Sequence, residues 1–205
     1  MAFNRRTAFI GAAAAVTVVA GATVVQAAYT DNMYPTANYG PRCVDGELND
    51  TFCQTDNRAL TIYSEKSLDS AERRTISRTV KDFYGPTDLA VQVSSSGVYK
   101  GDSETDIIYK SKRLYKTVVG VTWCDDAVTS RKCDQHHILI NSDHSEMGKL
   151  NKWHVCHETG HAVGLTHGTE ANPRKLLRDP ALGCMSYDPT YRLGANNRDN
   201  INSTY

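Results

Sequence analysis

The residues whose types and spacing best suit metal binding or catalysis lie in one short stretch, His157-Glu158-Thr159-Gly160-His161, and in the six residues that follow it. If this stretch is helical, His157 and His161 stand four positions apart on one face, so both imidazoles can reach one metal ion. Glu158 lies one step round the helix, where its carboxylate can take the proton of a water that the metal activates. The spacing therefore indicates two metal ligands and a general base.

A third histidine follows at a distance that lets the chain turn back. Gly164 has no Cβ, so it can adopt a positive φ, end the helix and return His167 to the same metal. Three neutral imidazoles with one open position are typical of a catalytic zinc site, whereas structural zinc sites usually have four protein ligands. We therefore predict one catalytic Zn²⁺ held by His157, His161 and His167. The four histidines to which we assign no ligand role are His136, His137, His144 and His154.

The pattern HExxHxxGxxH resembles the signature of the metzincin clan of zinc endopeptidases. That clan carries a methionine turn after the active-site helix, and Gly183-Cys184-Met185-Ser186-Tyr187 is similar to it. The resemblance implies that Met185 lies beneath the zinc ligands as an apolar floor and does not bind the metal. It also implies that Tyr187 approaches the zinc or stabilises an oxyanion, as in astacin-like and serralysin-like members. An ordinary packed tyrosine is the alternative.

Length and composition favour one globular domain. The chain has 205 residues, of which 40% are hydrophobic and 22% charged, which suffices for one sizeable core but not comfortably for two. The formal net charge is zero, so the charge balance predicts no nucleic-acid partner. We expect a monomer.

The N-terminal residues have the pattern of an export signal. Paired arginines precede an almost wholly apolar stretch over residues 8–25, and small residues stand at the usual cleavage offsets before a cut between Ala27 and Ala28. We predict a signal peptide over residues 1–27, exported by the Sec or the Tat route, and a secreted mature chain without stable membrane association. An uncleaved anchor is the alternative, because about 18 apolar residues can just span a bilayer.

Six cysteines in an exported chain indicate disulfides, although their number alone allows fifteen connectivities. Proximity along the chain favours two local bridges, Cys43–Cys53 and Cys124–Cys133. The remaining two cysteines stand beside the first zinc ligand and beside Met185. Because the metzincin fold puts its methionine turn under the active-site helix, the resemblance implies a Cys156–Cys184 bridge. Zinc ligation by one of these cysteines is the alternative.

Residues 28–57 are rich in Tyr, Asn, Asp, Thr and Pro and lack periodicity, so we expect an irregular segment. A removable pro-segment is a second interpretation. Pro41-Arg42-Cys43 resembles the start of the cysteine switch of matrixin pro-segments, in which a thiolate blocks the zinc, but Val44 does not continue that motif. The even number of cysteines favours a disulfide at Cys43 instead.

The remaining residues, 58–205, are predicted to form the catalytic domain. Alternating apolar residues predict five strands, and a capping box at Asp69–Glu72 opens a helix that ends at Gly85-Pro86. The predicted strands are 59–63, 89–93, 106–109, 118–123 and 136–140, and the other predicted helices are 151–163 and 196–203. This order implies an α+β fold. The metzincin resemblance implies a twisted, mostly parallel five-stranded sheet, an active-site helix and a short C-terminal subdomain after His167.

Val119–Trp123 resembles the fourth metzincin strand, which forms the edge of the substrate cleft. An exposed edge can add an extended peptide as a further strand, whatever the side chains of that peptide are. A plain edge strand is the alternative. The resemblance therefore implies a secreted zinc endopeptidase that binds polypeptides along residues 118–123 and hydrolyses them with Glu158 as the base. The competing hypothesis is a catalytically silent secreted zinc-binding or adhesion module.

Overall fold

The computed structural model describes most of the chain after the predicted signal peptide. The described residues are 32–36, 38–46, 52–143, 145, 148–167, 180–186 and 192–205. The predicted cleavage site, His144 and Tyr187 lie outside them. Within the described part, each helix is too short or too polar to cross a bilayer.

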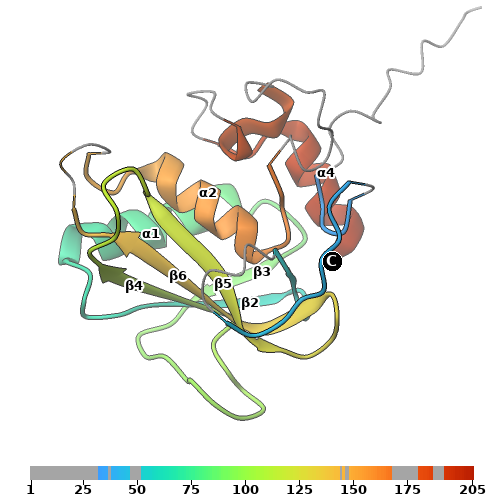
Figure 1. Ribbon diagram of the computed structural model, residues 1–205, viewed down its shortest axis with the longest axis horizontal. Helices are drawn as coiled ribbons and strands as arrows, with labels where there is room; N and C mark the ends of the chain where they lie inside the picture. Colours follow the sequence, from blue (N-terminus) through green and yellow to red (C-terminus); the bar gives the residue numbers. More distant parts are fainter. Residues whose placement is uncertain are drawn as a thin grey trace, which may run out of the picture.

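Six strands of the described chain form one sheet, shown in Figure 1. In chain order they are β1 (Gln54–Thr55), β2 (Ala59–Ser64), β3 (Ala90–Val93), β4 (Ile107–Lys112), β5 (Gly120–Ala127) and β6 (Lys132–Asn141). The order β3-β2-β4-β6 is parallel throughout, and β5 lies antiparallel to β6. The predicted mostly parallel sheet of an α+β fold is therefore confirmed.

The predicted number of strands was wrong by one. β1 has only two residues and pairs with the start of β6, so it is too short to show an alternating pattern in the sequence. β5 and β6 also run past their predicted ends, because their antiparallel pairing continues beyond Cys124 through a register shift at Asp126. The disulfide between Cys124 and Cys133 therefore links the two arms of a hairpin.

Two of the described helices begin where side chains satisfy their first N–H groups. In the described ranges they are α1 (Ser70–Phe83), α2 (Lys152–Ala162) and α4 (Ala195–Thr204), with a 3-10 segment η2 (Pro180–Met185). The Asp69 side chain accepts from the N–H groups of Ala71 and Glu72, and the Glu72 carboxylate accepts from Asp69 N–H. Asn151 caps α2 in the same way, and His154 is its reciprocal partner. His154 thus serves the helix cap.

Both long helices lie on one face of the sheet (Figure 1), and the core fills the space between them and the strands. α1 contributes Ile76, Val80 and Phe83 to this core. β6 contributes Ile138 and Ile140 on the same side. Burying each such side chain stabilises the fold by about 1.5–3 kcal/mol. We call the opposite side, which carries the alternate residues of β4, β5 and β6, the outer face.

The first residues that the structure describes pack against the segment that follows α2. Residues 32–34 run beside residues 164–166, with an isolated antiparallel bridge between them. Asn32 is fully buried, and its Nδ2 donates to the carbonyl of Thr166 at 2.7 Å. Thr166 N–H donates back to the carbonyl of Asn32, also at 2.7 Å. This segment therefore fixes the chain that leads from α2 to His167.

Three disulfides join all six cysteines: Cys43–Cys53, Cys124–Cys133 and Cys156–Cys184. The first leaves no thiol at Cys43 for a cysteine switch. The third links α2 to η2 across a sequence separation of 28 residues, with Cα atoms 6.0 Å apart. These are the pairs favoured by proximity in the sequence and by the metzincin resemblance.

Removing the third bridge, as Cys156→Ser with Cys184→Ser, is expected to lower both Tm and zinc retention. The bridge closes a loop of 28 residues, which is worth about 3–4 kcal/mol in the chain-entropy model, and it ties the helix of the predicted ligands to the segment beneath. Thermal unfolding and zinc analysis after dialysis measure the two effects. The matched control, Cys124→Ser with Cys133→Ser, should lower Tm with less zinc loss. Equal zinc loss in both double variants would contradict this role.

Candidate metal centre

The three predicted ligands lie together at the C-terminal end of α2. His157 and His161 project from one helix face, and the turn after the helix brings His167 back beside them. The Nε2 atom of His157 lies 3.1 Å from that of His161 and 3.2 Å from that of His167. One ligand atom from each residue lies within 4.8 Å of the others. The structure therefore brings all three together.

The turn that returns His167 depends on Gly164. Its φ is 90°, in the left-handed region that side-chain-bearing residues rarely adopt. Leu165 N–H donates to the carbonyl of Gly160 at 2.8 Å, which ends the helix, and Tyr34 N–H donates to the carbonyl of Gly164 at 2.7 Å. The positive φ predicted for Gly164 is confirmed.

Backbone carbonyls orient two of the imidazoles. The Nδ1 atom of His157 lies 2.8 Å from the carbonyl oxygen of Cys184, and that of His161 lies 2.8 Å from the carbonyl oxygen of Leu165. Because a carbonyl oxygen only accepts, each Nδ1 carries the proton and each Nε2 keeps its lone pair. Burial holds the pKa of His161 well below its usual range, and the neighbouring histidines add to this shift. His161 is therefore neutral, as a metal ligand must be.

The convergence of these nitrogens fits a zinc ion. The Nε2 atoms of His157 and His161 have no proton to share across their 3.1 Å separation, so their lone pairs repel unless a cation lies between them. Ligand nitrogens about 2.0–2.1 Å from a tetrahedral zinc are about 3.3 Å apart. The observed separations of 3.1 and 3.2 Å are close to that value. The residues present therefore suit zinc with three protein ligands.

Glu158 lies beside these histidines in a buried position, with 4% of its surface exposed. The hydroxyl of Thr122, on β5, donates to Glu158 Oε2 at 2.7 Å. Burial raises the pKa of Glu158 to about 7, while the Thr122 hydrogen bond and the neighbouring His167 oppose the rise. A carboxylate with a pKa near neutrality can both accept and release a proton at that pH. The sequence placed Thr122 in the edge strand but gave it no role.

Met185 lies against the underside of α2, with 1% of its surface exposed. A Cβ atom on Gly160 would stand 2.2 Å from the Met185 sulfur, so the glycine permits this close approach. The metzincin resemblance gave Met185 the role of an apolar floor beneath the histidines; its place against Gly160 of α2 agrees with that position, and the role itself stays a prediction. Tyr187 follows two residues later and lies outside the described residues, so its role stays a prediction.

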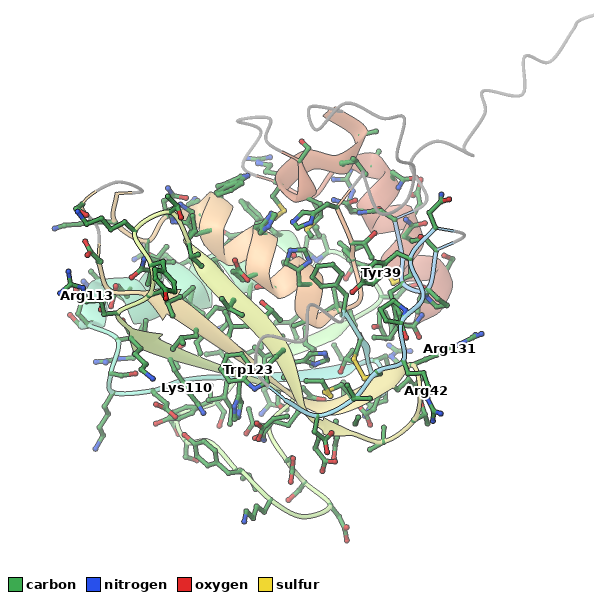
Figure 2. All side chains as sticks on the ribbon, in the orientation of Figure 1. Tyr39, Arg42, Lys110, Arg113, Trp123 and Arg131 are labelled. Carbon is green, nitrogen blue, oxygen red and sulfur yellow. A yellow bond between two sulfur atoms is a disulfide. The ribbon has the colours of Figure 1, made fainter. Side chains whose placement is uncertain are left out.

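Phe52 contacts two histidines of the metal centre, although nothing in the sequence near it predicts this. Its ring stacks on the His161 imidazole with centroids 4.2 Å apart and planes at 12°, and its edge meets His167 at 5.8 Å. Tyr39, labelled in Figure 2, packs on Phe52 at 5.3 Å. The next residue, Cys53, belongs to a disulfide that holds this segment in place. No local pattern links Phe52 to histidines more than 100 residues away.

A second aromatic ring lies over the first ligand. Trp153 stacks on His157 with centroids 5.1 Å apart and planes at 29°. Trp153 stands four residues before His157 in α2, so helical periodicity alone places it on the same face. This signal was present in the sequence and was missed.

Comparisons with known proteins add little. No family model and no curated protein matches the chain. Among solved structures it resembles high choriolytic enzyme 1, a hatching enzyme zinc-protease of the medaka fish Oryzias latipes, with 18% identity and a TM-score of 0.35. The match covers 61% of this chain and 54% of that enzyme. At this TM-score the likeness carries no functional argument, so the case for function rests on the site itself.

Substituting any one ligand, as His157→Ala, His161→Ala or His167→Ala, is expected to lower zinc content well below one ion per chain. Each change removes one of only three protein ligands. Metal analysis of dialysed protein measures the loss, and His137→Gln, on the outer face, is a control that should keep its zinc. Stoichiometric zinc in dialysed His167→Ala protein would show that the third ligand is misassigned.

Phe52→Ala is expected to raise the zinc dissociation constant by about two- to tenfold, the range for loss of one aromatic stacking contact. The ring limits the movement of His161, so its removal lets the ligand leave the position that favours the metal. Competition with a chromophoric chelator measures the constant, and Phe52→Leu, which keeps apolar cover, should show a smaller change. A folded Phe52→Ala protein with unaltered zinc affinity would rule out this positioning role.

Proposed function

We propose that the protein is a secreted zinc endopeptidase. The observation that carries the proposal is the convergence of three imidazole Nε2 atoms beside a buried carboxylate. Three protein ligands leave a tetrahedral ion with one position for water or substrate. A protein that only stores zinc needs no base there, whereas Glu158 is held at this position by a hydrogen bond from Thr122.

In peptide hydrolysis each residue of the site has its own role. A bound zinc ion supplies a water of lowered pKa and polarises the peptide carbonyl. Glu158 accepts the proton of the attacking water on its carboxylate, and it later gives that proton to the amine that leaves when the C–N bond breaks. The Thr122 hydroxyl, 2.7 Å from Oε2, keeps the carboxylate directed during both transfers.

The geometry of β5 supports a polypeptide substrate. Among the described strands only β6 pairs with β5, so its other side can hydrogen-bond to an added strand. The far end is closed, because Gly46 N–H donates to the carbonyl of Cys124 at 3.0 Å. The stretch from Gly120 to Trp123 is left for substrate, and Thr122 within it contacts Glu158. A peptide paired there passes beside the proposed base.

The proposed location rests on the cysteines and on the N-terminal pattern. Three disulfides join all six cysteines, as is usual for proteins of oxidising compartments. A signal peptide over residues 1–27 would deliver the chain to such a compartment. We propose that the mature protein acts there as a monomer, without nucleic acid and without stable membrane association.

Glu158→Gln is expected to keep its zinc and to lower kcat/KM for peptide hydrolysis by about 10²–10⁴, the usual contribution of a general base. The amide retains the shape of the side chain but cannot take a proton. Cleavage of a degenerate peptide library, read by mass spectrometry with a chelator control, measures the loss. Glu65→Gln, which changes a carboxylate elsewhere, is the matched control.

Two outcomes would count against the proposal. Equal cleavage by the wild type and by Glu158→Gln would show that the base is wrong. No cleavage by zinc-loaded wild type would favour the silent zinc-binding or adhesion module.

A further inference from the structure

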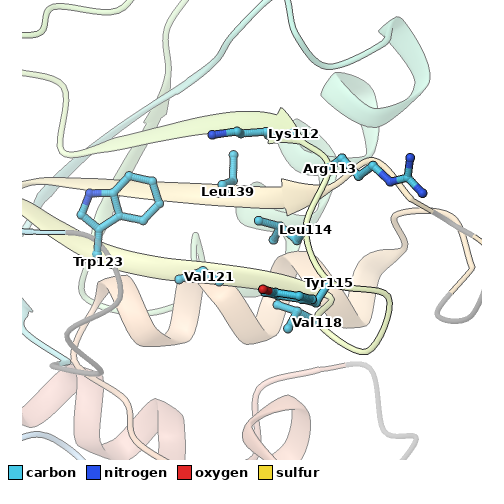
Figure 3. Close-up of a pocket in the computed structure, with 8 residues that line it drawn as sticks. All are labelled: Lys112, Arg113, Leu114, Tyr115, Val118, Val121, Trp123 and Leu139. Atoms are coloured by element: carbon cyan, nitrogen blue, oxygen red, sulfur yellow. The ribbon is translucent and has the colours of Figure 1, made fainter.

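Two residues of β5, Gly120 and Thr122, face α2. The residue between them, Val121, lies on the outer face of the sheet, where it lines a groove with Leu139 (Figure 3). Because side chains alternate along a strand, Gly120 and Thr122 share the opposite side. Both therefore lie next to Glu158.

Gly120 lies so close to Glu158 that no side chain fits between them. A Cβ atom on Gly120 would stand 2.8 Å from Oε1, 2.9 Å from Cδ and 3.0 Å from Cγ of Glu158. Carbon atoms that pack without strain are about 3.5–4.0 Å apart. The three nearest atoms all belong to Glu158, so its carboxylate lies directly on the bare Cα of Gly120.

The backbone at this position does not itself require a glycine. Gly120 is not among the described glycines with a positive φ, and it pairs regularly with Ile140 of β6. A glycine inside a strand weakens the strand, because it has no side chain to pack. The close approach of Glu158 is the feature of the structure that accounts for a glycine here.

The two oxygens of the Glu158 carboxylate have different surroundings. Oε2 accepts a hydrogen bond from the Thr122 hydroxyl at 2.7 Å. Oε1 lies over Gly120, and no residue in the described part of the chain donates a hydrogen bond to it. A hydrogen bond to a carboxylate oxygen lowers its affinity for a proton. Oε1 is therefore the more basic of the two oxygens.

We propose that Gly120 is a positioning residue of the peptidase and that Glu158 Oε1 takes the proton of the attacking water. The O–H bond of the water breaks, its electron pair stays on the oxygen that attacks the peptide carbonyl, and the proton passes to Oε1. Oε1 later gives this proton to the leaving amine. Gly120 leaves room for the carboxylate, while Thr122 holds Oε2. This inference rests on the proposed function.

Gly120→Ala is expected to lower kcat by about ten- to a hundredfold, because moving a catalytic group by about 1 Å can cost a factor of about 10². KM should stay within about twofold, since a peptide that pairs with the edge of β5 uses main-chain groups and no Cβ atom. Kinetics of the zinc-loaded full chain on a fluorogenic peptide measure both constants.

Two further variants separate a positioning role from general damage. In a Glu158→Gln background, Gly120→Ala should change kcat/KM by less than about twofold, because the base on which it acts is already absent. Gly97→Ala is the matched control, since its Cβ would stand 2.5 Å from the Tyr63 ring, in the loop between β3 and β4. It crowds a side chain as closely, yet it should leave kcat within about twofold of wild type.

Thermal unfolding in excess zinc tests the contact without measuring activity. Gly120→Ala should lower Tm in the wild-type background, because its Cβ displaces the Glu158 side chain. In a Glu158→Ala background the crowded side chain is absent, so the same substitution should raise Tm, since alanine restricts the unfolded chain more than glycine does. This comparison remains possible if the single variant does not fold.

The outcomes distinguish this inference from the proposed function. An active wild type whose kcat is unaltered by Gly120→Ala would overturn the role of Gly120 and leave the peptidase standing. An equal loss of kcat/KM with and without the Glu158 carboxylate, or an equal loss of Tm with and without its side chain, would also overturn it. No cleavage by the zinc-loaded wild type would overturn the peptidase, and this role with it.

Discussion

Two backbone carbonyls orient two of the three imidazoles that converge in the candidate metal centre. By accepting the Nδ1 protons of His157 and His161, the oxygens of Cys184 and Leu165 force both Nε2 lone pairs into the same small space. Neutral imidazoles would not hold such an arrangement by themselves, because their lone pairs repel. Each carbonyl therefore needs a firm anchor. Cys184 is tied to α2 by its disulfide, and Leu165 is bridged to Met33.

The parts of this arrangement that the sequence predicted are encoded over short distances. Spacing within one helix fixes which side chains share a face, so His157, Glu158 and His161 could be placed from their offsets alone. The capping box at Asp69 and the positive φ at Gly164 could be predicted from the sequence for the same reason, since each depends on a few neighbouring residues. A two-residue strand such as β1 contains too little pattern to be recognised.

Contacts between distant segments left no comparable signal. Phe52 meets His161, and Asn32 meets Thr166, only after the chain has folded. Thr122 lies in a strand that was predicted, but the side to which its hydroxyl points follows from the register of β5 on β6. One step in that register would exchange Thr122 with Val121, which would put an apolar side chain beside the base. The register of β5 on β6 therefore determines which side chain lies beside Glu158, and the amino-acid composition does not reveal that register.

The pairing of residues 32–34 with residues 164–166 also limits when the metal site can form. If the chain crosses a membrane unfolded, as the Sec route requires, residues 32–34 emerge long before residues 164–166 do. The turn that positions His167 is incomplete until both segments are on the same side. The metal site thus assembles late, after most of the chain has been delivered. If the protein is the peptidase proposed above, it then gains its activity only at its destination, which spares the export machinery.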